Sequence, residues 1–531
     1  MATYASRPAW DVRTRALTRG RLAVPGAFVS LLLLSLFIRT REIGIGFWID
    51  EGLSVGIANR PLGAIPHALR EDGSPPLYYV LLHYWLKPAG NTEAGVRALS
   101  LLFALLAIPV AWWAARAIFR SVKAAWIAAV LTALNPFLSQ YAQEARMYTL
   151  VALLMLPATA CFVRAYAMDA ETPQERRPWI AGFAVSVAAA LYTHNWPAFF
   201  AVAGLGAWAA LYRMAPAERR RELVRDGLLG FGGAFVLYLP WLPTTLYQAA
   251  HTGAPWADRP SLGGLSDVGT QLLGRIPQIV LLICAGAGLL ALLSPRGETQ
   301  RFTERGRAVL TLVILGLGTV LVAWLASQVS PAWANRYLAV ALPPFVLVAA
   351  GGLTFAGRLG LVGFALVLVM WAQDAAPEEK SNVRTVMQAV DPGLRPGDLV
   401  ISTQPETLAV IRYYGIDGLR YGTLTGGRTD VGVWDWRDGV DQLQATTPAR
   451  DLKPLIDAQP VGSRIVLVEP IFWTISRWRA PWTSLIRVRS LEWEQYIGND
   501  PRLQVTAIQP QSFDPPQPSA VQATVFVKTR R

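Results

Sequence analysis

The stretch WIAGFAVSVAAALYTHNWPAFFAVAGLGAWAALY (residues 179–212) carries no formally charged residue. A bilayer core of roughly 30 Å needs about 17–25 apolar residues for one helical span, so this window is too long for a single span. The segment YTHNWP (192–197) in its middle is typical of a tight turn. We therefore predict two membrane spans joined by this turn, within a polytopic membrane protein.

Charge-free windows of comparable length recur along the first 374 residues. They occupy residues 22–38, 98–115, 124–143, 147–163, 227–250, 276–295, 308–335, 337–357 and 359–373. The composition agrees with a membrane protein, because 53% of the residues are hydrophobic and only 16% are charged. Together with the first window, these segments predict an all-α membrane domain of about eleven transmembrane helices.

Basic residues alternate with the predicted spans. The segments before span one and after spans two, four, six, eight and ten hold 21 Lys or Arg, whereas the short loops on the other side hold few by comparison. The positive-inside bias therefore places the N-terminus in the cytoplasm and, with eleven spans, the C-terminus outside. This topology explains the net charge of +13 without nucleic-acid binding, because the charges form no single patch. The excess of Arg over Lys indicates a GC-rich bacterial genome, so we expect a multi-pass protein of a bacterial plasma membrane.

The composition changes after Asp374, where the sequence reads AAPEEKSN (375–382). We predict a transmembrane domain of residues 1–374 and an extracytoplasmic soluble α/β domain of residues 375–531. Three segments of this second domain have the pattern of strands: GDLVIST (397–403), RIVLVEP (464–470) and ATVFVKT (523–529). Two others have the pattern of helices: VRTVMQAV (383–390) and PETLAVIRYY (405–414).

The first external loop, residues 39–97, is much longer than its neighbours. Within it, PLYYVLLHYWL (76–86) is too short to span a bilayer and rich in aromatic residues, which is typical of an interfacial helix. PLGAIPHALR (61–70) is a second candidate for such a helix. A loop of this kind shapes a cavity between membrane and water, which suits a substrate that is half lipid and half sugar.

Acidic, basic and aromatic residues from distant loops share the predicted outer face. The first loop contributes four of them: Asp50, Glu51, Asp72 and Tyr78. Later turns contribute seven more: Tyr141, Glu144, Arg146, Tyr148, His194, Arg336 and Tyr337. The planar fork of arginine suits phosphate oxygens. A carboxylate can accept the proton of an acceptor hydroxyl, typically for about 10²–10⁴-fold in rate, and can stabilise an oxocarbenium-like transition state. This set predicts sugar transfer from a lipid phosphate by single displacement with inversion.

Four short elements in this order carry a family resemblance: Asp50-Glu51 after span one, SPPLYY (74–79), EARMY (144–148) and RY (336–337). On them the sequence resembles the polytopic glycosyltransferases of the GT-C fold. The closest group is the superfamily of protein O-mannosyltransferases and aminoarabinose transferases, with its bacterial family 39 members. Many eukaryotic relatives carry a histidine before the double proline, where this chain has Ser74.

The resemblance implies a polyprenyl-phosphate sugar as donor and Asp50 as the catalytic base. It also implies that no metal or other cofactor is needed for the chemistry, in keeping with the absence of an Asp-x-Asp motif from the first loop. We assign the remaining candidates in three groups: supporting acids (Glu51, Asp72, Glu144), donor-phosphate ligands (Arg146, Arg336, Tyr337) and substrate-binding residues (Tyr78, Tyr141, Tyr148, His194).

Simpler interpretations compete with these assignments. Asp50 could only cap a helix that begins at Glu51, and Asp72 could only form a turn before Gly73. The arginines could be interfacial anchors, and His194 could be structural. At the level of function, the alternatives are a flippase or exporter of lipid-linked sugars and a structural protein that presents the C-terminal domain. The sequence leaves open which sugar is moved, whether the acceptor is a cell-envelope glycan, a lipid or a protein, what the C-terminal domain does, and the oligomeric state.

Overall fold

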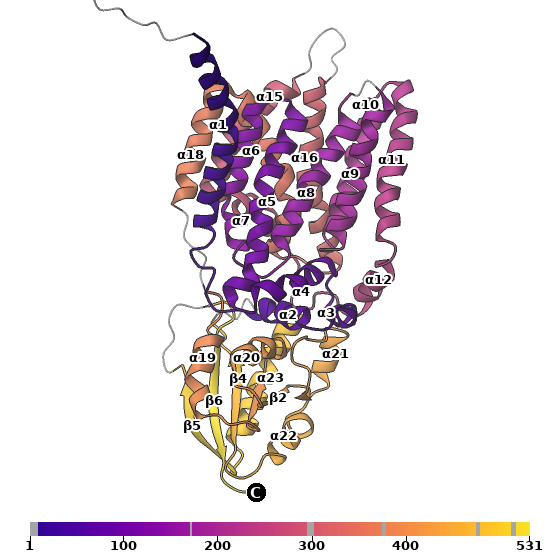
Figure 1. Cartoon of the computed structure of the whole chain (residues 1–531). Helices are drawn as coiled ribbons and strands as arrows, with labels where there is room; N and C mark the ends of the chain where they lie inside the picture. Colours follow the sequence, from indigo (N-terminus) through magenta and orange to yellow (C-terminus); the bar gives the residue numbers. More distant parts are fainter. Residues whose placement is uncertain (1–8, 170–171, 295–301, 374–378, 474–477, 511–516) are drawn as a thin grey trace, which may run out of the picture.

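The structure is a computed structural model that describes residues 9–169, 172–294, 302–373, 379–473, 478–510 and 517–531. Long helices lie side by side at one end of the molecule and a sheet domain lies at the other, with a layer of short helices between them (Figure 1). The predicted boundary at residues 374–375 falls outside the described residues. The long helices are α1 (Ala9–Ile38), α5 (Glu93–Phe119), α6 (Val122–Leu134), α8 (Tyr148–Phe162) with the π-helical turn η2 (Val163–Ala167), α9 (Pro173–Leu191), α10 (Pro197–Met214), α11 (Ala217–Tyr238), α15 (Arg275–Leu293), α16 (Glu304–Val329), α17 (Leu342–Phe355) and α18 (Gly357–Ala372).

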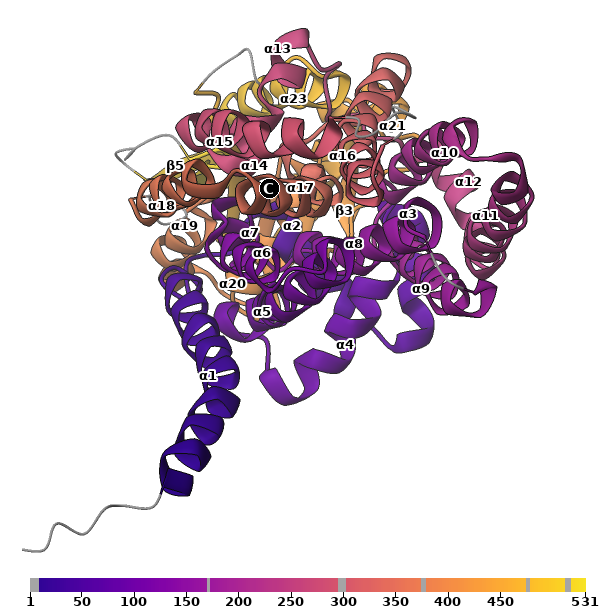
Figure 2. The same cartoon turned by 90° about the horizontal axis from the view of Figure 1, so that it is seen from above.

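A helix coincides with each of the predicted membrane spans in the described part of the chain. Four segments are long and apolar enough on their own to cross a membrane: α5, α8 with η2, α15 and α16. The apolar part of α1, Val24–Ile38, and the helices α6, α17 and α18 are shorter. Seen from above, the helices form a bundle from which the start of α1 extends (Figure 2). The number of spans stays a prediction.

The window 227–250 does not form one straight helix. The helix α11 ends at Tyr238, and α12 (Leu242–His251) continues after a bend of 72°. Pro240 lies in the break and has no N–H to donate to a preceding carbonyl, which is the physical reason for the interruption. The second part of this window is therefore a separate short helix, and Gln248 on it donates a hydrogen bond to the carbonyl of Leu69 in α3 (Ile65–Asp72).

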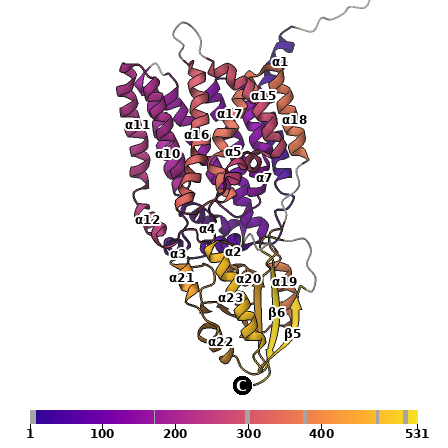
Figure 3. The same cartoon turned by 180° about the vertical axis from the view of Figure 1, so that it is seen from behind.

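The layer between bundle and sheet consists of short helices, among them α2, α3 and α4 (Figures 1 and 3). The short helices of the first 373 residues are α2 (Ile49–Ala58), η1 (Leu62–Ala64), α3 (Ile65–Asp72), α4 (Leu77–Ala89), α7 (Pro136–Tyr141), α12, α13 (Leu262–Ser266), α14 (Val268–Leu273) and η3 (Asn335–Val340), as far as the structure describes this part. The helices α3 and α4 occupy the two segments predicted to be interfacial. The first external loop ends earlier than residue 97, because the Thr92 side chain accepts a hydrogen bond from the Gly95 N–H and caps α5 there.

The C-terminal part is a mixed six-stranded sheet in the order β3-β2-β1-β4-β6-β5. The strands β2, β1 and β4 are parallel to one another, and β3, β6 and β5 pair antiparallel with their neighbours. The strands are β1 (Leu399–Ser402), β2 (Arg420–Thr423), β3 (Gly426–Arg428), β4 (Arg464–Pro470), β5 (Leu503–Gln509) and β6 (Val521–Lys528). Its helices are α19 (Val383–Val390), η4 (Asp391–Gly393), η5 (Pro405–Thr407), α20 (Leu408–Tyr414), α21 (Gly439–Gln444), η6 (Pro448–Leu452), α22 (Lys453–Asp457) and α23 (Pro481–Gly498).

Close backbone contacts fix α2 against the C-terminal domain. A Cβ atom at Gly56 would lie 2.1 Å from the carbonyl oxygen of Gly432, and one at Gly52 would lie 2.4 Å from Cγ2 of Val410. Both glycines therefore permit an approach that a larger residue would prevent. Arg437 of the C-terminal domain also binds Glu71 of α3, with Nη2 and Oε1 3.0 Å apart. The domain thus closes over the first turn of α2, which carries Asp50.

Candidate functional site

A buried ion pair between Glu51 and Arg97 holds the N-terminus of α2. Glu51 accepts hydrogen bonds from Nε and Nη2 of Arg97, at 2.7 and 2.6 Å, and from the Ala145 N–H at 2.8 Å. Arg97 also donates to the carbonyls of Ile43, Ile45 and Gly46. This pair ties α2, α5 and the turn before α8 together. The Glu51 side chain is 0% exposed, so in this structure it holds the helices together.

The neighbouring carboxylate, Asp50, lies between two arginines. Its Oδ2 is 3.9 Å from Nε of Arg146 and 3.5 Å from Nη2 of Arg336. These contacts are too long for hydrogen bonds, and within the described residues Oδ2 has no hydrogen-bond partner. Nε of Arg146 and Nε of Arg336 are also buried without a partner there. The three residues predicted for catalysis and phosphate binding are therefore together and incompletely paired.

Polar groups on α2 and α4 hold the guanidinium of Arg146. Its Nη1 donates to the Asp50 carbonyl at 3.4 Å, to Oγ of Ser54 at 3.2 Å and to the Tyr79 hydroxyl at 3.2 Å. The predicted substrate ligand Tyr78 lies elsewhere: it is fully buried, and its hydroxyl is 3.1 Å from Oγ of Ser100. Adjacent residues of a helix face about 100° apart, so only one of the two tyrosines can reach Arg146. In the structure Tyr79, and not Tyr78, forms the hydrogen bond to Arg146, and substrate binding by Tyr78 stays a prediction.

Aromatic rings surround the guanidinium of Arg336. Its Cζ lies 5.0 Å from the ring centroid of Trp256, 5.5 Å from that of Tyr337 and 5.6 Å from that of Trp48. Such contacts hold a cation without neutralising it. The Tyr337 ring in turn packs against two further predicted residues, with its centroid 4.5 Å from that of His194 and 6.2 Å from that of Tyr148. These rings form an aromatic wall around Arg336, made of Trp48, Trp256, Tyr337, His194 and Tyr148.

His194 is a neutral member of this wall. Its Nδ1 accepts a hydrogen bond from the Trp196 N–H at 3.1 Å, so the ring proton resides on Nε2. Burial, followed by the charges of Arg146 and Arg336, lowers the pKa of His194 to about 3. A neutral imidazole can donate through Nε2 but supplies no positive charge at physiological pH.

Asp72 lies at the edge of the same cluster, at the C-terminus of α3. The helix ends there because Gly73 adopts a left-handed conformation with φ of 92°. Burial raises the pKa of Asp72, while a hydrogen bond from Ser74 and the charge of Arg146 act in the opposite direction. Asp72 thus lies within electrostatic reach of Arg146, and also of Asp50, whose charge raises its pKa further.

Glu144 pairs with Lys380 and not with its sequence neighbour Arg146. The Lys380 ammonium also lies 4.5 Å from the ring centroid of Trp48 and 5.8 Å from that of Tyr141. Oε2 of Glu144 is buried and has no partner in the described chain. Lys380 follows the membrane domain in sequence and was not among the predicted site residues. It brings a third cation to the aromatic wall.

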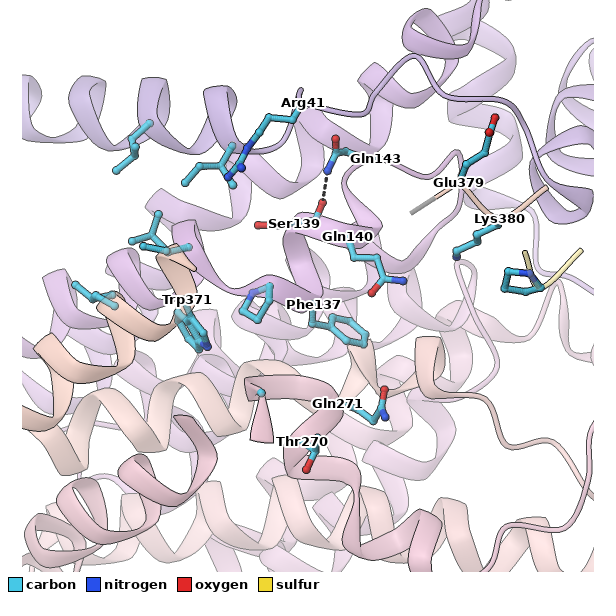
Figure 4. Close-up of a pocket in the computed structure, with 18 residues that line it drawn as sticks. Arg41, Phe137, Ser139, Gln140, Gln143, Thr270, Gln271, Trp371, Glu379 and Lys380 are labelled. Atoms are coloured by element: carbon cyan, nitrogen blue, oxygen red, sulfur yellow. Dashed lines mark hydrogen bonds between the residues drawn. The ribbon is translucent and has the colours of Figure 1, made fainter. Parts of the chain in front are cut away.

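A cavity of about 630 Å³ begins at Lys380 and extends between α1, α7, α14 and α18. Figure 4 shows Lys380, Gln140 and Arg41 around it, with Trp371 at another part of the wall. Leu34, Leu134 and Leu368 also line it. The cavity therefore has a polar lining near Lys380 and an apolar lining on the long helices.

Within the described residues, no group of three or more His, Cys, Asp or Glu is placed to hold a metal ion. That the chemistry needs no metal stays a prediction.

The comparisons with known proteins agree on the architecture. Residues 73–253 match the sequence model of the dolichyl-phosphate-mannose-protein mannosyltransferase family. ArnT from Cupriavidus metallidurans in the apo state superposes with a TM-score of 0.61 at 12% identity, over 95% of this chain and 98% of that one. The chain has the GT-C fold. The resemblance found in the sequence is thereby confirmed.

Other GT-C structures show the same similarity. ArnT bound to undecaprenyl phosphate gives a TM-score of 0.59 at 13% identity, over 96% of this chain and 98% of that one. The Archaeoglobus fulgidus oligosaccharyltransferase AglB, in complex with an inhibitory peptide and a dolichol-phosphate, gives a TM-score of 0.51 at 11% identity, over 83% of this chain and 69% of that one. The mycobacterial arabinofuranosyltransferase AftD gives a TM-score of 0.53 at 16% identity, over 97% of this chain and 40% of that one. No curated protein sequence matches the chain.

Proposed function

We propose that the chain is a membrane glycosyltransferase that moves a sugar from a polyprenyl-phosphate sugar to an acceptor hydroxyl on the extracytoplasmic face. The single observation that carries this proposal is the incompletely paired cluster of Asp50, Arg146 and Arg336, which we call the open cluster. In it, Oδ2 of Asp50 lies 3.9 Å from Nε of Arg146 and 3.5 Å from Nη2 of Arg336. The comparisons support it, because residues 73–253 match the dolichyl-phosphate-mannose-protein mannosyltransferase family model and the structures similar to this chain include the arabinofuranosyltransferase AftD.

The two arginines are the proposed ligands of the donor phosphate. Each has a buried Nε–H without a partner in the described residues, and buried donors of this kind normally bind an acceptor. A phosphate placed between them would accept these hydrogen bonds, with Tyr337 beside it as part of the aromatic wall. Among the similar structures, ArnT is bound to undecaprenyl phosphate and AglB to a dolichol-phosphate.

Asp50 is the proposed base. Its carboxylate is next to the proposed phosphate position, and 19% of its side chain is accessible. It would take the proton of the acceptor hydroxyl while the oxygen attacks the anomeric carbon and the bond to the lipid phosphate breaks. Single displacement of this kind inverts the anomeric configuration.

The cavity beside Lys380 fits the lipid character of the proposed substrates. Its lining changes from apolar side chains on α1, α6 and α18 to amides and cations near the site. An amphiphile bound there would have its polar group next to Lys380 and thus next to Trp48.

The test is a transfer assay on the purified chain in nanodiscs. Polyprenyl-phosphate mannose, aminoarabinose and arabinofuranose are offered in turn, together with membrane lipid, glycan and protein fractions as acceptors. We expect one donor to be converted to polyprenyl phosphate with formation of an inverted glycosidic product, measured by mass spectrometry and NMR. Movement of intact lipid-linked sugar between leaflets without any glycosyl product would contradict the proposal and favour an exporter.

A further inference from the structure

A buried acid of the C-terminal domain, Glu406 in η5, has one oxygen without a partner. Its Oε1 accepts hydrogen bonds from Nε2 of Gln404 at 3.0 Å and from Nε1 of Trp482 at 3.1 Å. Its Oε2 is buried and makes no hydrogen bond with any described residue, and the residue is only 6% exposed. Buried carboxyl oxygens rarely lack a partner, so this atom needs an explanation.

Glu406 lies on the face of the C-terminal domain that covers the site. Three and four residues further on, Ala409 and Val410 of α20 pack against Gly52 of α2, two residues from Asp50. The charge of Asp50 acts on Glu406 across this contact.

The second partner of Glu406 connects to the opposite wall. The backbone N–H of Trp482 donates to the carbonyl of Pro255 at 3.1 Å, and the next residue, Trp256, faces Arg336 at 5.0 Å. Glu406 thus lies between the segment that packs beside Asp50 and the segment that faces Arg336.

We propose that the C-terminal domain completes a subsite for the donor sugar, in which Oε2 of Glu406 hydrogen-bonds a sugar hydroxyl. This inference rests on the proposed function. The donor sugar is one bond from the phosphate, and Asp50 lies between the two phosphate-binding arginines. Glu406 precedes the α20 residues that pack on α2 beside Asp50, which puts it in reach of a sugar bound there, whereas no hydrogen bond of the described chain joins Glu406 to either arginine.

The protonation state of Glu406 suits this role. Burial raises the pKa of Glu406, and the negative charge of Asp50 raises it further. A protonated Oε2 is an O–H donor that can bind a hydroxyl oxygen without placing a second negative charge beside Asp50.

The experiment compares two lipid probes on the full chain in nanodiscs. One probe is undecaprenyl phosphate, and the other is whichever of the undecaprenyl-phosphate mannose, aminoarabinose and arabinofuranose binds most tightly. The wild type should bind the sugar-bearing lipid more tightly than undecaprenyl phosphate. Glu406→Leu should lower affinity for the sugar-bearing lipid about fivefold to tenfold and leave affinity for undecaprenyl phosphate unchanged.

Two further variants separate sugar binding from packing. Glu406→Gln keeps a neutral side chain with a donor and should retain most of the affinity for the sugar-bearing lipid. Glu469→Gln removes another acid of the same domain, whose pKa burial raises to about 8, and should change neither affinity. An equal loss of both probes in Glu406→Leu, or no loss of either, would overturn the proposal. Failure of the wild type to bind either lipid would overturn the proposed function itself.

A pH series keeps the proposal testable if Glu406→Leu does not fold. Because the protonated form of Glu406 donates the bond, the wild type should lose its preference for the sugar-bearing lipid as the pH rises. Among the described residues, the charged group that acts on Glu406 is Asp50 on α2, and Asp50 is in turn surrounded by Asp72 on α3, Arg146 before α8 and Arg336 in η3. They are unchanged in Glu406→Gln, so this variant should keep its preference over the same pH range. An identical pH dependence in the two proteins would overturn the proposal.

Discussion

Two adjacent acids at the start of α2 meet arginines in opposite ways. Glu51 is fully buried and forms two short hydrogen bonds with Arg97, at 2.7 and 2.6 Å. Asp50 is partly exposed, and its carboxylate approaches the guanidinium groups of Arg146 and Arg336 no closer than 3.9 and 3.5 Å. The first pair satisfies its own groups, whereas the second leaves a carboxylate oxygen and two Nε–H donors free within the described chain. A closed pair fixes the backbone, and an open one is available to a substrate.

The largest effect on folding should come from breaking the closed pair. Arg97→Met removes the partner of a buried carboxylate and frees three backbone carbonyls. Loss of one member of a buried ion pair typically costs about 3–5 kcal/mol. We expect a large drop in the thermal unfolding temperature of the protein in detergent or nanodiscs. An Arg97→Met protein with the wild-type unfolding temperature that no longer binds undecaprenyl phosphate would contradict this assignment, because it would place the Glu51–Arg97 pair in lipid binding and not in folding.

The matched change in the open cluster is Arg336→Met. Arg336 is held by aromatic rings and a distant carboxylate, so its loss should leave the unfolding temperature nearly unchanged. Loss of charge-assisted hydrogen bonds to a phosphate should weaken undecaprenyl phosphate binding about tenfold to a hundredfold. Binding measured on nanodisc-embedded protein checks this, and wild-type affinity would show that Arg336 is only an interfacial anchor.

A smaller, pH-dependent effect is expected from His194. Its pKa is lowered to about 3 in the folded state, from about 6.5 in the unfolded chain. The unfolded state therefore binds the proton more readily, and stability falls as the pH drops below 6.5. By linkage, acidification to pH 5 costs the wild type about 2 kcal/mol from this residue.

His194→Phe keeps an aromatic ring against Tyr337 and removes the titrating group. The difference in unfolding temperature between pH 7 and pH 5 should be smaller in this variant than in the wild type. All other titratable residues are the same in both proteins, so the comparison isolates His194. An equal acid sensitivity would show that His194 is not buried in its neutral form.

Much of the fold was predictable because it rests on periodic or continuous hydrophobic patterns. The helix over residues 383–390 and the strand over 464–470 have the predicted bounds, and β1 lies within its predicted segment. The strands β2 and β3 were missed because RYGT and GGR contain glycine and no hydrophobic pattern. The strand β5 was missed as well, and its residues are all partly or fully exposed.

The site was predictable only where short motifs marked it. Asp50, Arg146 and Arg336 were proposed from the resemblance, and the structure brings them together. Arg97, Lys380 and Glu406 were missed because each is a single residue whose partner is distant in sequence. Lys380 and Glu144, for example, are 236 positions apart. No local pattern encodes such a contact, since it depends on how segments distant in sequence pack together.

The assignment of the open cluster as the catalytic centre is tested most directly by the turnover of Asp50→Asn. The change keeps the shape of the side chain and removes its ability to accept a proton. The account predicts a transfer rate lower by about 10²–10⁴-fold, with thermal unfolding and undecaprenyl phosphate binding retained. A well-folded Asp50→Asn protein that transfers sugar at the wild-type rate would contradict it.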